Sequence, residues 1–445
     1  MNTPICDFVR SYIEKNPVRL HMPGHKGESL LGFESYDITE IVGADSLYEA
    51  SGIIKESEEN ASKLFGSYTY YSTEGSSLAI RAMLYLACLY SAEKGEKPLV
   101  LAGRNAHKVF VSSAALLDFD VEWLVSEKDD TYLSCRIMPE DVERKLISLE
   151  RKPVTVYLTS PDYLGNESDI SGIADICHKH GVLLLVDNAH GAYLKFLPES
   201  RHPIDLGADM CCDSAHKTLP VLTGGAYLHI AGSAPEMFKE RAKDSLSLFG
   251  STSPSYLILQ SLDAVNAYID DSYKKDLTEM LVRISELKDK LILNGYNLIG
   301  SEELKITIET KSYGYTGYEF ASVLEEKGLA CEFSDPDYVV LMLTPQTKGQ
   351  LAMISEVLLS VDKKQPIIKK SPAITLPTKA VGIRQAYFSE TQKIKAEEAC
   401  GRILASASVG CPPAVPIVIS GEVITQEAVE CFKYYGIDTC IVLSE

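Results

Sequence analysis

The sequence predicts an α/β fold with a large domain on a mainly parallel sheet, plus smaller C-terminal α/β domains. Residues 61–265 alternate between strand-like and helix-like patterns, which is typical of βαβ units. Within them, VLLLVD at 182–187 is a continuous apolar run, and ADMCCDSA at 208–215 resembles a second such segment. Runs of this kind are found in strands that are buried on both faces of a parallel sheet.

The domain organisation follows from composition along the chain. An amphipathic stretch at 273–295 leads into a smaller α/β portion that contains KITIET and YVVLMLTP. The Pro- and Lys-rich stretch at 363–379 is the best linker candidate. We therefore expect four parts: an N-terminal arm at 1–60, the large domain at 61–265, a small α/β domain at 266–370 and a C-terminal domain at 371–445.

Composition excludes several classes of protein. The chain has 62 acidic and 43 basic residues, and its formal net charge of −19 argues against nucleic acid as a partner. This charge mildly favours a cationic substrate, although ordinary solubility is the simpler explanation. The N-terminus lacks the pattern of a secretory signal, and no apolar stretch approaches the roughly 18 residues of a membrane helix. We expect a cytoplasmic protein.

Cysteine usage indicates reduced thiols and no metal site. The 11 cysteines show no metal-type CxxC spacing, and the pair Cys211 and Cys212 falls in a predicted buried strand. The cluster from Cys177 to His180 lies on a predicted helix, where residues two apart do not share a face. No metal is predicted there.

The chemistry is concentrated at two strand ends. Asp187 ends the first apolar run, and Lys217 follows the second in DSAHKTL. In open α/β sheets, ligands bind outside the carboxyl ends of the strands. A lysine amine there can form a Schiff base with pyridoxal 5′-phosphate (PLP), and a buried carboxylate can keep the pyridine nitrogen of that cofactor protonated. Together the two residues predict a PLP site, although each alone could be an ordinary turn or surface residue.

Two further segments agree with this prediction. Gly75, Ser76 and Ser77 form a small-residue turn before a helix expected from Leu78, and a helix N-terminus can bind a phosphate. A Ser-Ser pair before a helix is also a common N-cap. A P-loop is not supported, because no GxxxxGK[ST] string occurs. His107 follows another buried-type strand and could stack on the pyridine ring, or it could be a surface histidine.

Taken in order, the motifs resemble those of the ornithine/lysine/arginine decarboxylase family. This family consists of PLP enzymes of fold type I, which are related in fold to the aspartate aminotransferases. The chain resembles the short form, without the N-terminal wing domain of larger members. The matching motifs are HMPGHKG at 21–27, TEGSS at 73–77, RNAHK at 104–108, TSPDYLG at 159–165, VDNAHGAY at 186–193, DSAHKTL at 213–219, STSPSYLILQSLD at 251–263, and GRI, CPPAVP and SGE within 401–422.

The resemblance implies a role for each matching residue. Lys217 would be the Schiff-base lysine, Asp187 the pyridinium partner and His107 the stacking ring, with Ala189 opposite it. The remaining cofactor contacts would be Gly75, Ser76, Ser77, His190, Ser214 and His216. Ser251 and Thr252 would reach the phosphate of a neighbouring subunit, which implies a homodimer with its active sites at the interface.

The implied activity is decarboxylation of a basic amino acid, arginine or lysine first and ornithine next, to an amine that serves polyamine biosynthesis. The proton donor would be His216 or Lys217 itself. A cationic distal group needs a carboxylate, and Glu422 and Asp162 are candidates, although either could equally be a solvated turn residue.

Three positions depart from the family pattern. Asn188 stands where Glu is more common, Asp162 where Thr is common and Ala414 where Gly is usual. These departures put the substrate in doubt and keep two alternatives open. One is another PLP reaction on the same fold, of aminotransferase or aldolase type, and the other is a non-catalytic PLP-binding protein with a regulatory or assembly role.

Overall fold

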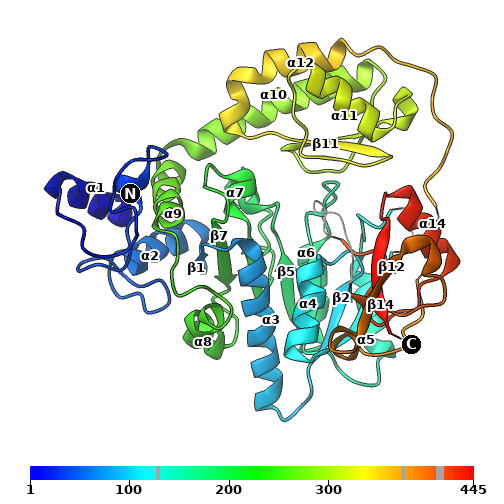
Figure 1. Ribbon diagram of the computed structural model, residues 1–445, viewed down its shortest axis with the longest axis horizontal. Helices are drawn as coiled ribbons and strands as arrows, with labels where there is room; N and C mark the ends of the chain where they lie inside the picture. The colour runs from blue at the N-terminus through cyan, green and yellow to red at the C-terminus, as the bar shows by residue number, and fades with distance from the viewer. Residues whose placement is uncertain (127–130, 373–375, 407–414, 445) are drawn as a thin grey trace. The chain divides into compact units, whose positions relative to one another are not determined.

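The computed structural model describes residues 1–126, 131–372, 376–406 and 415–444 of the 445-residue chain. Figure 1 colours the chain by residue number. The chain divides into two compact units. The first unit comprises residues 1–96 and 170–277, and the second comprises residues 97–169 and 278–445.

A mostly parallel seven-stranded sheet confirms the predicted α/β class. Its strand order is β1-β7-β6-β5-β4-β2-β3. The pairs β5/β6, β2/β3 and β2/β4 are parallel, whereas β7 is antiparallel to both β6 and β1. The strands are β1 Tyr68–Ser72, β2 Leu99–Gly103, β3 Asp120–Leu124, β4 Thr155–Thr159, β5 Leu183–Asp187, β6 Met210–Asp213 and β7 Ala226–Ile230.

Burial explains why the sequence predicted these strands. Every residue of β2, β5, β6 and β7 is buried. A strand with both faces covered needs apolar side chains throughout, so its sequence loses the alternation of a half-exposed strand. Asp187 therefore ends one fully buried strand, β5, Lys217 follows a second, β6, and His107 follows a third, β2.

The first unit carries helices before, between and after its strands. Helix α3 is long and apolar, and it begins at Gly75 rather than at the expected Leu78. The helical elements of this unit are α1 Pro4–Lys15, η1 Glu34–Tyr36, α2 Ile53–Phe65, α3 Gly75–Glu93, α6 Ile170–Lys179, η2 Ala192–Phe196, α7 Ala215–Thr218, α8 Glu236–Ser247, α9 Tyr256–Tyr268 and the π-helical η3 Ile269–Tyr273.

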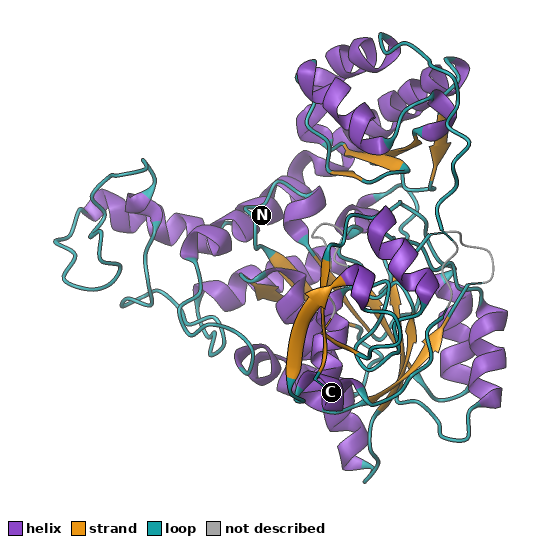
Figure 2. Cartoon of the chain, turned by 45° about the vertical axis from the view of Figure 1, so that its right-hand side comes forward, coloured by secondary structure: helices purple, strands orange, loops and turns teal. Residues whose placement is uncertain are grey.

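The second unit contains two small antiparallel sheets, with strand orders β10-β11-β9-β8 and β12-β14-β13. Three helices, α10, α11 and α12, cover one face of the four-stranded sheet (Figures 1 and 2). The strands are β8 Asn297–Ile299, β9 Lys305–Glu309, β10 Phe333–Ser334, β11 Tyr338–Met342, β12 Thr391–Lys395, β13 Leu404–Ser406 and β14 Thr439–Leu443.

The second unit also contains helices. They are α4 Lys108–Leu117, α5 Pro139–Ser148, α10 Lys274–Leu293 (which starts at the end of the first unit), η4 Lys311–Tyr313, α11 Gly317–Glu326, η5 Pro345–Gln350, α12 Leu351–Leu359, α13 Ile383–Tyr387, η6 Ala396–Glu398 and α14 Gln426–Tyr434. Among the described residues, no helix has the length and apolar character needed to cross a membrane.

Candidate functional site

Lys217 lies in the one-turn helix α7, directly after β6. Its backbone N–H donates to the Ser214 carbonyl at 3.0 Å, which closes the turn. Its Nζ lies 3.0 Å from Nε2 of His190, a buried residue of the loop that follows β5. The lysine amine and an imidazole from two strand-end loops therefore meet at the carboxyl edge of the sheet.

Asp187 ends β5 and is almost fully buried. Its Oδ1 accepts the Ala189 N–H at 3.2 Å and faces the Cys212 thiol, whose Sγ lies 3.7 Å away. Burial raises the pKa of the Cys212 thiol well above its usual value, and the Asp187 charge raises it further. The thiol therefore stays protonated and donates to the carboxylate, which holds Asp187 in place.

The N-terminus of α3 approaches the same segment. Gly75 has φ of 70°, a conformation that favours glycine, and its N–H donates to the Gly224 carbonyl at 2.7 Å. Ser76 and Ser77 lie in the first helical turn rather than before it, so they are not the N-cap. The Ser214 hydroxyl donates to the Ser76 hydroxyl at 2.9 Å. Hydroxyls from α3 and the α7 cap thus converge at a helix N-terminus.

These features fit a phosphorylated aldehyde cofactor. A lysine amine, a buried carboxylate and a helix N-terminus with two hydroxyls are the donor set that PLP requires, and all lie in the first unit. His216, beside Lys217, is fixed through Nδ1, which lies 3.0 Å from the Gly225 carbonyl. Because a carbonyl only accepts hydrogen bonds, Nδ1 carries the proton.

Three further predicted contacts are His107, Ser251 and Thr252. His107 belongs to the second unit, where it is the N-cap of α4 and its Nδ1 accepts the Val109 N–H at 3.2 Å. Ser251 and Thr252 belong to the first unit and are exposed. The backbone N–H of Ser251 donates to the Glu74 carboxylate at 2.6 Å.

A buried polar network behind β6 was not predicted. Asp213 accepts hydrogen bonds at Oδ2 from Nε2 of His202 at 3.1 Å and of His229 at 3.2 Å. Burial alone would raise the pKa of Asp213, but the two imidazoles lower it below its usual range. The three residues come from β6, β7 and the segment after η2, so no local pattern in the sequence could have revealed their contact.

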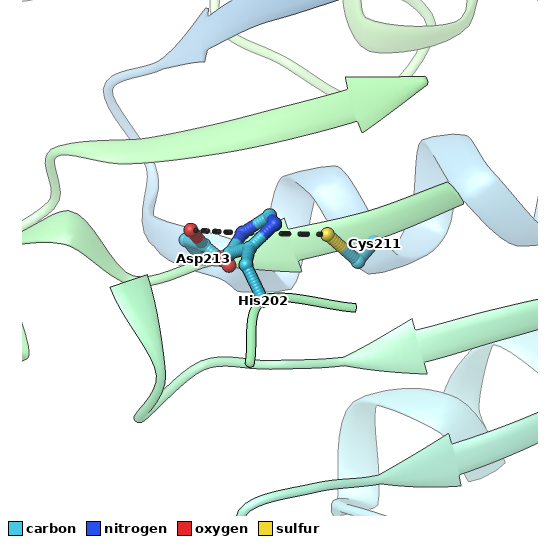
Figure 3. Close-up of side chains that lie close together, drawn as sticks. All are labelled: His202, Cys211 and Asp213. Carbon is cyan, nitrogen blue, oxygen red and sulfur yellow. Dashed lines mark hydrogen bonds and ion pairs between the residues drawn. The ribbon is translucent and has the colours of Figure 1, made fainter. Parts of the chain in front are cut away.

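Figure 3 shows His202 between Asp213 and Cys211, whose Sγ lies 3.8 Å from Nε2. The three potential ligand atoms lie within 4.8 Å of one another, which is close enough for a metal ion. The hydrogen bonds to Asp213 already engage the His202 nitrogen that would bind the metal. The arrangement therefore fits a hydrogen-bonded buried carboxylate, and we assign no metal to it.

The network also explains the departure at Asn188. Its Nδ2 donates to Oδ1 of Asp213 at 2.7 Å. A glutamate at this position would place a second carboxylate against the ionised Asp213, whereas an amide supplies the donor that Asp213 needs. Ala414, another departure, lies outside the described residues.

Asp162, a candidate for recognising the distal group of the substrate, stabilises a loop. Its Oδ1 accepts the N–H groups of Leu164 and Asn166, both at 2.9 Å. Its Oδ2 accepts from the Asn166 side chain at 2.9 Å and from the Ser134 hydroxyl. Burial raises the pKa of Asp162, and the hydrogen bonds from Ser134 and Asn166 and the charge of Lys305 oppose that rise. The carboxylate is enclosed and fully used within the second unit.

Glu422, the other candidate for the distal group, is also engaged. Its Oε2 accepts from Nη2 of Arg104 at 2.8 Å and from the Ile419 N–H at 2.7 Å. Both side chains of this ion pair are buried. Burial raises the pKa of Glu422 and lowers the pKa of Arg104, and each partner's charge opposes the shift of the other. Glu422 is therefore a partner of Arg104.

The fold and the lysine after β6 place the chain among the fold type I enzymes. Models of the family confirm this and give the particular branch: the Orn/Lys/Arg decarboxylase major domain matches residues 3–306, and the C-terminal domain of the same family matches residues 365–438. The chain belongs to the Orn/Lys/Arg decarboxylase family, and it is a decarboxylase.

Relatives and solved structures agree with this assignment. The uncharacterized protein YaaO of Bacillus subtilis is 30% identical, with 97% of this chain and 93% of that protein covered. The arginine decarboxylase of the same organism is 28% identical over 96% and 92% of the two chains. The Francisella novicida lysine decarboxylase LdcF has a TM-score of 0.78 at 18% identity, covering 99% of this chain and 79% of that one. The constitutive lysine decarboxylase of E. coli has a TM-score of 0.76 at 18% identity, covering 100% and 82%.

Proposed function

We propose that the chain is a PLP-dependent decarboxylase of a basic amino acid, arginine or lysine first and ornithine next. One observation carries the proposal: Nζ of Lys217 contacts the His190 ring in the first unit. The same unit holds Asp187 at the end of β5, the strand that pairs with β6 before Lys217. The arginine decarboxylases among the relatives support a basic substrate. Another PLP reaction and a non-catalytic role are less favoured, because the matched family consists of decarboxylases.

We assign the cofactor contacts as follows. Lys217 holds the cofactor covalently, Asp187 pairs with its ring nitrogen, and His107 stacks on the ring, with Ala189 on the other face. When bound, the cofactor supplies an electron sink for the bond to Cα that breaks. The first turn of α3, with Ser76 and Ser77, and the hydroxyl of Ser214 bind the phosphate, while Gly75 lets the chain turn into that helix and His190 and His216 flank Lys217.

His216 and Lys217 remain the two candidates for returning a proton to Cα. In neutral His216 the proton sits on Nδ1, which is directed at the Gly225 carbonyl, and Nε2 is unprotonated. His216 can therefore donate from Nε2 only as an imidazolium. Lys217 could donate only as an ammonium, a form that is open to it once its amine is no longer bound to the cofactor.

We also propose a cytoplasmic homodimer whose amine product enters polyamine biosynthesis, with the four-part domain organisation given by the sequence. The exposed Ser251 and Thr252 would serve the partner's site. The N-terminal arm supports an interface, because Val18, Leu20 and Leu30 are 85%, 89% and 86% exposed. Apolar side chains gathered in one segment at such exposure are typical of a surface that another chain covers.

Carbon dioxide release tests the function. The PLP-loaded protein is assayed with arginine, lysine and ornithine in parallel, and Lys217→Ala serves as the blank. We expect release from one of these substrates and none in the blank, because the variant cannot hold the cofactor covalently. Visible absorbance of the lysine-linked cofactor without release from any of the three would overturn the decarboxylase proposal and leave cofactor binding intact.

A further inference from the structure

The ion pair of Arg104 and Glu422 connects two parts of the second unit that are far apart in the sequence. Arg104 directly follows β2, whereas Glu422 lies in the segment that matches the family's C-terminal domain. Their side chains are only 12% and 7% exposed, and Nη2 lies 2.8 Å from Oε2. A pair this deeply buried fixes its geometry closely, because either charge alone would be strongly destabilising.

Other contacts hold the guanidinium from further sides. Nη2 of Arg104 also donates to the Ile417 carbonyl at 3.2 Å, and the guanidinium carbon lies 5.2 Å from the centre of the Trp123 ring. The Ile419 N–H keeps the Glu422 carboxylate in place. A planar guanidinium can satisfy an ion pair, a carbonyl and an aromatic face together, which a lysine ammonium could not do in the same geometry.

From Arg104 the chain reaches His107 in three residues. The Arg104 N–H donates to the Leu124 carbonyl at 3.0 Å, and the Ala106 N–H donates to Gly103 at 3.1 Å. These bonds leave the connection little freedom. His107 then caps α4 through its own ring, so the direction of the ring depends on where this loop places the first turn of the helix.

We propose that Glu422, acting through Arg104, is a positioning residue that sets the orientation of the His107 ring. The C-terminal part of the chain would then contribute to seating the cofactor as well as to stability. This inference rests on the proposed function, in which His107 stacks on PLP. Glu422 would not touch substrate or cofactor.

Glu422→Gln tests the proposal, because glutamine keeps the volume and an acceptor for Ile419 but removes the charge. Three properties are measured: the Kd for PLP by absorbance titration, the visible circular dichroism of the bound cofactor, and kcat and KM separately. We expect Kd to rise and kcat to fall by about tenfold, the size typical of coupled neighbouring residues, with an altered dichroism signal and an unchanged KM. The matched control is Gln385→Ala, an exposed residue that lines the same surface cavity as Glu422, and it should change none of them.

A double-mutant cycle with His107→Ala separates positioning from plain destabilisation. If Glu422 acts through His107, adding Glu422→Gln to His107→Ala should change the Kd for PLP no further. Additive effects, or a lowered melting temperature with wild-type Kd and dichroism, would overturn the inference. If Glu422→Gln fails to fold, Arg104→Lys takes its place in the same cycle with the same expectations. A wild-type protein that binds no PLP would instead refute the proposed function.

Discussion

Asp335 offers a sharp test of how burial controls ionisation in this chain. It lies on the tight loop between β10 and β11 and is 3% exposed. Its Oδ1 accepts the N–H groups of Asp337 and Tyr338, both at 2.7 Å. Among the described residues, its Oδ2 has no hydrogen-bond partner although it is buried. Asp335→Asn keeps the acceptor that shapes the loop and removes the ionisable group.

The size of the expected change in folding stability follows from the pKa of Asp335. Burial, and then the charge of Asp337, raise the pKa of Asp335 from 3.8 to about 7, although Lys311 and two backbone N–H groups oppose the rise. Because the folded pKa is the higher one, the stability associated with this carboxyl is fully present below pH 3.8 and is lost as pH rises to about 7. At 1.36 kcal/mol per unit, the cost is about 2 kcal/mol at pH 5.5 and about 4 kcal/mol at pH 8.

We therefore expect Asp335→Asn to be more stable than the wild type, by a margin about 2 kcal/mol larger at pH 8 than at pH 5.5. Urea unfolding of both proteins at the two pH values measures it, followed by a signal from the second unit. Asp362→Asn, an exposed carboxylate in the same unit, is the control and should show no such change. An Asp335→Asn margin that is the same at both pH values would refute the assignment of a raised pKa.

Three further predictions concern packing and buried charge. Asn188→Asp should lower the free energy of unfolding by about 3 kcal/mol, because it places a second carboxylate beside Asp213. Adding Asp213→Asn to the same chain should restore most of that stability. Urea unfolding measures both variants. Asp162→Ala should cost about 3 kcal/mol in the same assay, because four donors lose their acceptor, and an unchanged stability would contradict the loop role. Gly191→Ala should lower the melting temperature, because its Cβ would lie 2.0 Å from Asn188 Oδ1; an unaltered melting temperature would show that this loop yields easily.

Much of the sheet could be predicted because buried strands are marked by apolar runs in the sequence. The run at 182–187 became β5, and 208–215 contains β6, since a fully buried strand must be apolar along its whole length. The start of α3 was placed three residues late, because Gly75 already has the geometry that begins the helix while its sequence suggests a turn. Helix ends depend on such single residues, and periodicity does not resolve them.

Some residues of the candidate site carry a signal in the sequence, and for others the surroundings are known only after folding. Lys217 and Asp187 could be proposed from the sequence because motifs along the chain mark both, and the strands that precede or contain them are neighbours in the sheet. For Asp162 and Glu422 the sequence left two interpretations, substrate recognition and a solvated turn, because a sequence shows a carboxylate but not the donors that surround it; both side chains are buried and hydrogen-bonded, so the solvated turn is wrong. Only the folded chain brings Ser134 to Asp162 and Arg104 to Glu422.

The sequence by itself determined the α/β class and the decarboxylase family, because these depend on local hydrophobic pattern and on motifs of a few residues; the residues that would hold PLP stay a prediction from the same motifs. Only the tertiary structure decided which polar groups pair with one another. It showed that Asp213 is surrounded by two histidines and an amide, and that Glu422 is joined to the loop before His107. Such pairs form between segments far apart in the chain, and burial makes them strong, so their partners appear only once the chain has folded.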